Sequence, residues 1–119
     1  MTTPLVVVGA GALGREVHDI VDAVNAVTPE GEGYEFLGFV DNANPHPELL
    51  ADRGTSVIGG DEVMATLPKN TQYVIAINDT ESRRRVDAAA TALGLTAATL
   101  VHPLASLGRH RITIGPGSV

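Results

Sequence analysis

The chain has 119 residues, with 14 acidic and 8 basic side chains, a formal net charge of −6, 44% hydrophobic residues and no cysteine. This length fits one domain with a single core, and the lack of cysteine excludes a disulfide framework, a thiolate zinc site and a cysteine nucleophile. The acidic balance argues against nucleic-acid binding, and no apolar run approaches the ~20 residues of a membrane span. The histidines show no metal-ligand spacing. We therefore expect a soluble, cytoplasmic domain without a metal site.

The first half of the chain predicts a strand, a helix and a second strand. Leu5–Val8 is a β-branched run typical of a buried parallel strand. An apolar stripe at helical spacing then predicts a helix that ends at Val27, on which His18 is expected to be a surface or boundary residue. Residues 28–33 read as a loop, and Tyr34–Val40 as a strand that ends at Asp41.

The second half continues the alternation of strands and helices. Residues 43–54 are predicted to be mostly loop with a helical turn at 48–52, and residues 56–59 a short strand. Asp61 is the expected N-cap of a brief helix over 62–67, which precedes a strand over 72–77. Asp79 or Thr80 then caps a helix that Gly94 ends, and a last strand covers 96–101. This order predicts an α/β fold over residues 3–102, a Rossmann-like open and mainly parallel sheet flanked by helices.

The tail, residues 103–119, has a different sequence pattern from the alternating strands and helices before it. Ile114–Val119 matches one unit of a hexapeptide repeat, in which an apolar residue and small residues recur at fixed positions. Such repeats build parallel β-helices, which need about three stacked units for stability. We therefore expect this tail to be the beginning of a truncated β-helix region.

Gly9, Gly11 and Gly14 fit the pattern G-x-G-x-x-G between a strand and a helix. The first glycine permits the turn, the second lets the backbone approach a phosphate, and the third lets the helix pack close to the strand. The helix amides near Ala12 and Leu13 would then face an anion. The alternative is that the glycines serve close packing alone.

Polar residues follow two of the predicted strands. Asp41 could accept hydrogen bonds from a ribose or a uracil, or could simply form a turn with Asn42. Asn78 and Asp79 leave the end of the strand that contains Ile77, where ligands of open α/β sheets bind. Arg83 could pair with a phosphate, although a solvated helix start with an Asp79 cap explains these residues equally well. Arg84 and Arg85 are expected on a solvated helix face.

These features, taken in order, resemble the N-terminal domain of the NeuD/PglD family of sugar O-/N-acyltransferases. The segments that carry the resemblance are Val8–Val17, Gly38–Asn42, Val57–Gly60, Val74–Asp79 with Arg83, Leu100–Ala105 and Ile114–Gly117.

The resemblance implies a two-part parent enzyme. Its Rossmann-like domain would bind a nucleotide-linked sugar, and a left-handed β-helix would bind acetyl-CoA, commonly as a homotrimer. The family's general base is a histidine of the β-helix, so no catalytic residue is assigned in this chain, and residues 1–119 alone are expected to be a monomer or weak dimer without a cofactor. By motif position, Gly11, Ala12 and Leu13 would contact the nucleotide phosphates. Asp41 and Asn42 would face the base or ribose, and Ile77, Asn78 and Asp79 would line the same crevice.

Two other functions stay open at this level. One is a dinucleotide- or CoA-binding Rossmann module of an oxidoreductase or regulator, which the glycine motif and Asp41 would also suit. The other is a structural or assembly module with a vestigial site.

Overall fold

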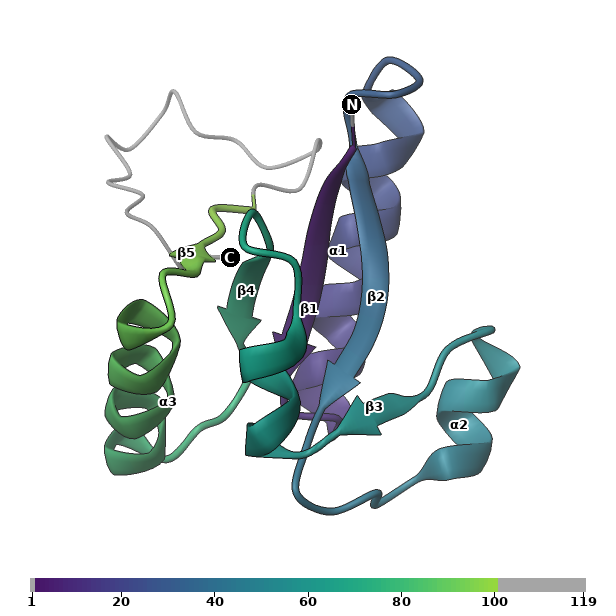
Figure 1. Ribbon diagram of the computed structural model, residues 1–119. Coiled ribbons are helices and arrows are strands. Elements are labelled where there is room, and N and C mark those ends of the chain that lie inside the picture. The colour runs from purple at the N-terminus through teal and green to yellow at the C-terminus, as the bar shows by residue number, and fades with distance from the viewer. Residues whose placement is uncertain (1, 101–119) are drawn as a thin grey trace, which may run out of the picture.

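The computed structural model describes residues 2–100, which form five parallel strands with helices on both faces (Figure 1). The sheet has the order β3-β2-β1-β4-β5, and every paired neighbour is parallel. The predicted Rossmann-like α/β fold is therefore confirmed, whereas the predicted β-helix tail at 103–119 lies outside the described residues. In chain order the elements are β1 (Thr3–Val8), α1 (Ala12–Val27), β2 (Tyr34–Val40), α2 (Pro47–Asp52), β3 (Val57–Gly59), the 3-10 helix η1 (Asp61–Thr66), β4 (Gln72–Ile75), α3 (Thr80–Ala92) and β5 (Thr96–Ala97).

β1 is the central strand, which explains its uninterrupted apolar sequence. Leu5, Val6 and Val7 are completely buried because helices cover both faces of the sheet. From β1 the chain adds β2 and then β3 on one side, and afterwards β4 and β5 on the other. The strand order therefore reverses between β1 and β4, the position at which open α/β sheets bind their ligands.

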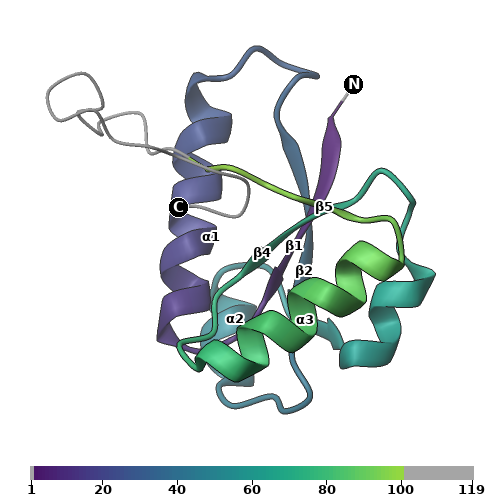
Figure 2. The same ribbon diagram turned by 90° about the vertical axis from the view of Figure 1, so that its left-hand side faces the viewer.

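Helices lie on both faces of the sheet (Figure 2), and an apolar cluster fills the space on each face. On one face, Val17 and Val21 of α1 pack with Leu50 of α2 against alternate residues of the strands. On the other face, Val86 and Ala90 of α3 pack with Met64 of η1. α3 and η1 therefore share one face of the sheet.

The elements depart from the predictions mainly at their ends. The helical turn expected at 48–52 is the helix α2, and the helix expected over 62–67 is the 3-10 helix η1. β4 stops at Ile75, short of the predicted Ile77, and β5 covers Thr96–Ala97 alone. β5 is an edge strand that pairs with the short β4, and after it the backbone N–H of Ala98 still donates to the carbonyl oxygen of Tyr73 at 2.9 Å.

Candidate functional site

A cavity of about 250 Å³ lies at the carboxyl ends of β1, β2 and β4. It lies where the strand order reverses, and polar and apolar side chains share its lining. We call it the crevice. It is lined by Val8, Gly9, Val40, Asp41, Asn42, Asp61, Ile77, Arg85 and Val86. Of the residues predicted from sequence, Gly9, Asp41, Asn42 and Ile77 line it directly.

The three motif glycines have different structural roles. Gly9 has a φ of +111°, and a Cβ there would lie 2.5 Å from the carbonyl oxygen of Ala76. At Gly14 a Cβ would collide with the carbonyl oxygen of Gly9, so the lack of a side chain allows α1 to pack on the turn. Gly11 has an unstrained backbone, and a Cβ there would meet nothing within 4 Å. Packing therefore accounts for two glycines and leaves Gly11 beside open space.

The N-terminus of α1 has no side-chain cap. Gly11 is the N-cap residue and forms no side-chain hydrogen bond, while Ala12 is exposed and Leu13 half-buried. The first amides of a helix lack partners within the helix and carry partial positive charge. Gly11, Ala12 and Leu13, the three residues predicted to contact phosphates, thus form the start of a helix that is open to an anion, and they lie beside the crevice rather than among its lining residues.

Asp41 fixes the glycine turn to the end of β2. Its Oδ2 accepts a hydrogen bond from the backbone N–H of Ala10 at 2.9 Å, and its Oδ1 accepts one from Ala43 at 2.9 Å. The second bond is the predicted Asp turn. Each carboxylate oxygen has two lone pairs, so one backbone donor leaves each of them able to accept a further bond from a ligand.

Asn42 and Asp61 form a reciprocal pair on the wall of the crevice. The Asn42 side chain donates to Asp61 Oδ2 at 3.2 Å, and the Asp61 backbone N–H donates to Asn42 Oδ1 at 2.9 Å. The prediction that Asp61 is an N-cap is wrong. Gly60 holds that position without a side-chain bond, and Asp61 is the first residue of η1. Its carboxylate instead joins η1 to the end of β2.

Asp79 is the N-cap of α3, as one of the predicted alternatives had it. Its Oδ2 accepts hydrogen bonds from the backbone and hydroxyl of Ser82 at 2.9 and 2.6 Å, and these bonds lower the pKa of the carboxyl group. Arg83 donates to the carbonyl oxygen of Ile77 at 3.2 Å. Asn78 and Asp79 are exposed, and neither they nor Arg83 are among the residues that line the crevice.

Arg85, like Asp61, is a lining residue that the sequence analysis missed, since it was assigned to a solvated helix face. The side chain is exposed, yet it lines the crevice from α3, next to Val86. A signal was present in the sequence, because Arg85, Ala89 and Leu93 recur at helical spacing along the edge of the apolar stripe.

No group of three or more histidine and carboxylate side chains within residues 2–100 is arranged to hold a metal ion. None of the helices in this range combines the length and apolar content needed to cross a bilayer.

The glycine turn, the uncapped α1 and a crevice at the strand reversal define a Rossmann-like domain with a candidate ligand site. Comparison with known families finds that residues 4–88 match the PglD N-terminal domain. The chain therefore belongs to the PglD N-terminal domain family, as the sequence resemblance predicted.

Solved structures agree with this assignment. The chain is similar to the acetyltransferase domain of PglB from Neisseria gonorrhoeae FA1090, solved in complex with acetyl coenzyme A, with 26% identity and a TM-score of 0.68 over 87% of this chain and 45% of that one. A second structure of the same domain gives 26% identity and a TM-score of 0.68 over 86% of this chain and 45% of that one. The chain thus spans less than half the length of these solved chains. A search of curated proteins finds no significant match.

Proposed function

We propose that this chain is the nucleotide-sugar-binding domain of an acetyl-CoA-dependent sugar acetyltransferase. The observation that carries the proposal is the space beside Gly11, where a Cβ would meet no atom within 4 Å although the glycine lies at the N-terminus of a helix. Packing does not require a glycine there, whereas a phosphate approaching the backbone does. Family membership and the similarity to an acetyltransferase domain solved with acetyl coenzyme A support the class of enzyme.

In this proposal the residues bind and orient the donor-linked sugar and take no part in acetyl transfer. The N–H groups of Ala12 and Leu13 contact the phosphates, aided by the positive end of α1. Asp41 and Asn42 accept hydrogen bonds from the ribose or base, and Ile77 supplies an apolar wall. Acetyl-CoA supplies the acetyl group, and we assign its binding to a β-helix region of the parent protein.

Calorimetric titration of the chain with UDP, a UDP-sugar and NAD tests this proposal. We expect the UDP compounds to bind wild type, Gly11→Ala to weaken binding, and Gly11→Val to weaken it at least tenfold because the branched side chain occupies the phosphate's space. Since the Gly11 backbone has a φ of −80°, both variants should fold. Equal affinity in wild type and Gly11→Val would place the ligand elsewhere.

The ligand panel also separates the alternatives. Asp41 lies at the end of β2, where dinucleotide-binding domains hold the ribose, so tight NAD binding without UDP binding would favour a dinucleotide module. Binding of none of the ligands at millimolar concentration would contradict the proposal and leave a vestigial site.

A further inference from the structure

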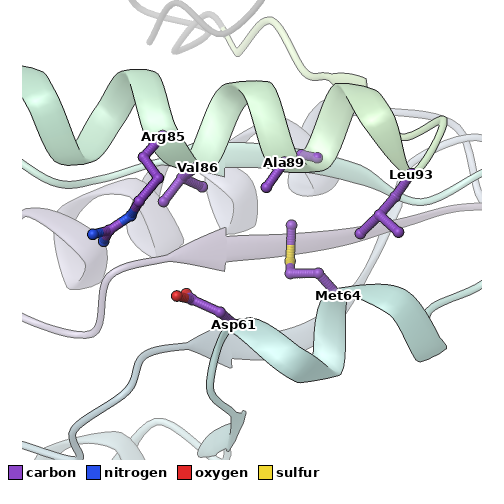
Figure 3. A pocket seen from close by; sticks show the side chains of 7 residues that line it. Asp61, Met64, Arg85, Val86, Ala89 and Leu93 are labelled. Atoms are coloured by element: carbon purple, nitrogen blue, oxygen red, sulfur yellow. The ribbon is translucent and has the colours of Figure 1, made fainter.

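A second cavity, of about 220 Å³, lies between η1 and α3 (Figure 3). Its lining is apolar except at one end, where Asp61 of η1 and Arg85 of α3 lie opposite each other. We call it the groove. It is lined by Asp61, Met64, Arg85, Val86, Ala89, Ala90 and Leu93. Asp61, Arg85 and Val86 also line the crevice, so the two cavities are adjacent and share the residues of this polar end.

Most of the lining of the groove is apolar, and the whole groove has a volume of about 220 Å³. Met64, Val86 and Ala90 belong to the core, and Leu93 is 44% exposed at the far end. A cavity of about 150 Å³ with a similar aliphatic lining binds benzene, so this groove can take a ring or a short alkyl chain. A ligand that covered Leu93 would remove apolar surface from water, which favours binding.

The shared end of the two cavities carries a cation without an ion-pair partner. Within residues 2–100, no carboxylate lies within 4 Å of the Arg85 guanidinium, and the ion pairs of this range involve other residues. The Asp61 carboxylate is held by Asn42 at 3.2 Å instead. An anion at this end would pair with Arg85, while Asp61 would accept a hydrogen bond from a hydroxyl or N–H of the same ligand.

We infer that the ligand of this site carries an apolar group of ring size within a few bonds of a phosphate, which lies in the groove while the phosphate pairs with Arg85. This inference rests on the proposed function, in which the amides of Ala12 and Leu13 contact the phosphates, and it adds Arg85 as a second phosphate contact and the groove as the site of an apolar group. The apolar group could come from the base of a nucleotide or from an alkyl or acyl substituent, and both sources share the chemistry of an apolar group close to an anion.

A series of phosphate monoesters with alkyl chains of increasing length tests whether the groove binds an apolar group. The chain is titrated with inorganic phosphate and with methyl, butyl and hexyl phosphate, and affinity is followed by calorimetry and by NMR shifts of the α3 amides. We expect affinity to rise by at most about fourfold per methylene, since burying one methylene is worth about 0.8 kcal/mol, and to level off once the groove is full. Affinity independent of chain length would overturn the inference.

Two pairs of substitutions locate the binding. Ala88 and Ala89 are both exposed residues of α3, but only Ala89 lines the groove. Ala89→Leu should fill the groove and abolish the gain with chain length, whereas Ala88→Leu should keep it. Arg85→Gln should weaken every phosphate by a similar factor, and Arg84→Gln should not. Equal behaviour of the two alanine variants would also overturn the inference.

Nucleotide titrations distinguish the source of the apolar group and separate the two proposals. Weaker UMP binding in Ala89→Leu would identify the base as the group in the groove, and loss of hexyl phosphate binding alone would identify a chain. If the affinity for phosphate esters depends on chain length but no UDP-sugar binds wild type, the proposed function is contradicted and the inference about the groove is supported. If a UDP-sugar binds and Gly11→Val blocks it, while the affinity for phosphate esters does not depend on chain length, only the inference about the groove is contradicted.

Discussion

His18 is a buried titratable group on α1, where a surface or boundary residue was expected. It is 6% exposed, its ring stacks on Phe36 at 4.3 Å between centroids, and Phe39 meets it edge-on at 5.7 Å. Within the described part of the chain its Nδ1 has no hydrogen-bond partner, and its Nε2 lies 3.8 Å from Asp22. Burial lowers the pKa of His18, and Asp22 opposes this to a smaller extent. The imidazole therefore serves as an aromatic core residue.

The lowered pKa predicts a loss of stability in mild acid. The unfolded chain takes up a proton near pH 6.5, whereas the folded chain does so only at lower pH, so the unfolded state binds more protons in between. The free energy of unfolding should fall as pH drops below about 6.5 and level off below the folded pKa. Urea unfolding from pH 8 to 5 measures this. His18→Phe should reduce the slope, and His46→Gln, whose side chain is half exposed, is the control. An unchanged slope in His18→Phe would contradict the prediction.

The two long helices differ at their N-termini, and this difference explains why only one suits an anion. The Asp79 side chain caps α3 and brings a negative charge, whereas α1 starts at Gly11 without a cap. An anion at α3 would meet a carboxylate, and an anion at α1 would meet free amides. From its position in the sequence, after a predicted parallel strand and before a predicted helix, Asp79 could have been either a ligand contact or a helix N-cap. The structure shows that it is a cap.

The packing of α1 on β1 predicts opposite effects of one methyl group at two glycines. Gly14→Ala should destabilise the fold by about 1–3 kcal/mol, because the new Cβ collides with the Gly9 carbonyl and pushes the helix off the strand. Gly11→Ala should change stability by less than about 1 kcal/mol, because its Cβ meets open space. Chemical denaturation of both variants measures this difference. Equal stability of the two would contradict the assigned roles.

At the scale of the whole molecule, neither histidine of the described residues belongs to the candidate site. His18 is enclosed by aromatic rings, and His46 is the N-cap residue of α2. Neither side chain lines the crevice or the groove. Under the proposed function, this domain binds the nucleotide-sugar and a β-helix region of the parent protein transfers the acetyl group.

We predict that a polypeptide of residues 1–119 binds a UDP-sugar without transferring acetyl groups to it. Release of free CoA thiol from acetyl-CoA in the presence of a UDP-sugar measures this, with calorimetry on the same sample as the control for binding. Thiol release above the rate without protein would place a catalytic group within these residues.

The sequence by itself determined the class of fold and the glycine turn. Leu5–Val8 has apolar residues on both faces, α1 has a long stripe at helical spacing, and the spacing of Gly9, Gly11 and Gly14 requires a strand-to-helix turn. These signals are local or strictly periodic, so they can be recognised without knowing which residues lie nearby in space. The type of η1 and the ends of β4 and β5 could not be predicted in this way, because they depend on the elements against which they pack.

Only the tertiary structure decided which residues share the crevice. Asp41 and Ala10 are far apart in sequence and become hydrogen-bonded because β1 and β2 are adjacent parallel strands. Asp61 and Arg85 come from η1 and α3, which meet only because both cover the same face of the sheet. From sequence alone, a charged residue on a helix is assigned to the solvent-exposed face, because the surface against which the helix packs is not known. The sequence therefore predicted the position of the glycine turn, whereas only the packing of η1 and α3 showed that Asp61 and Arg85 line the crevice.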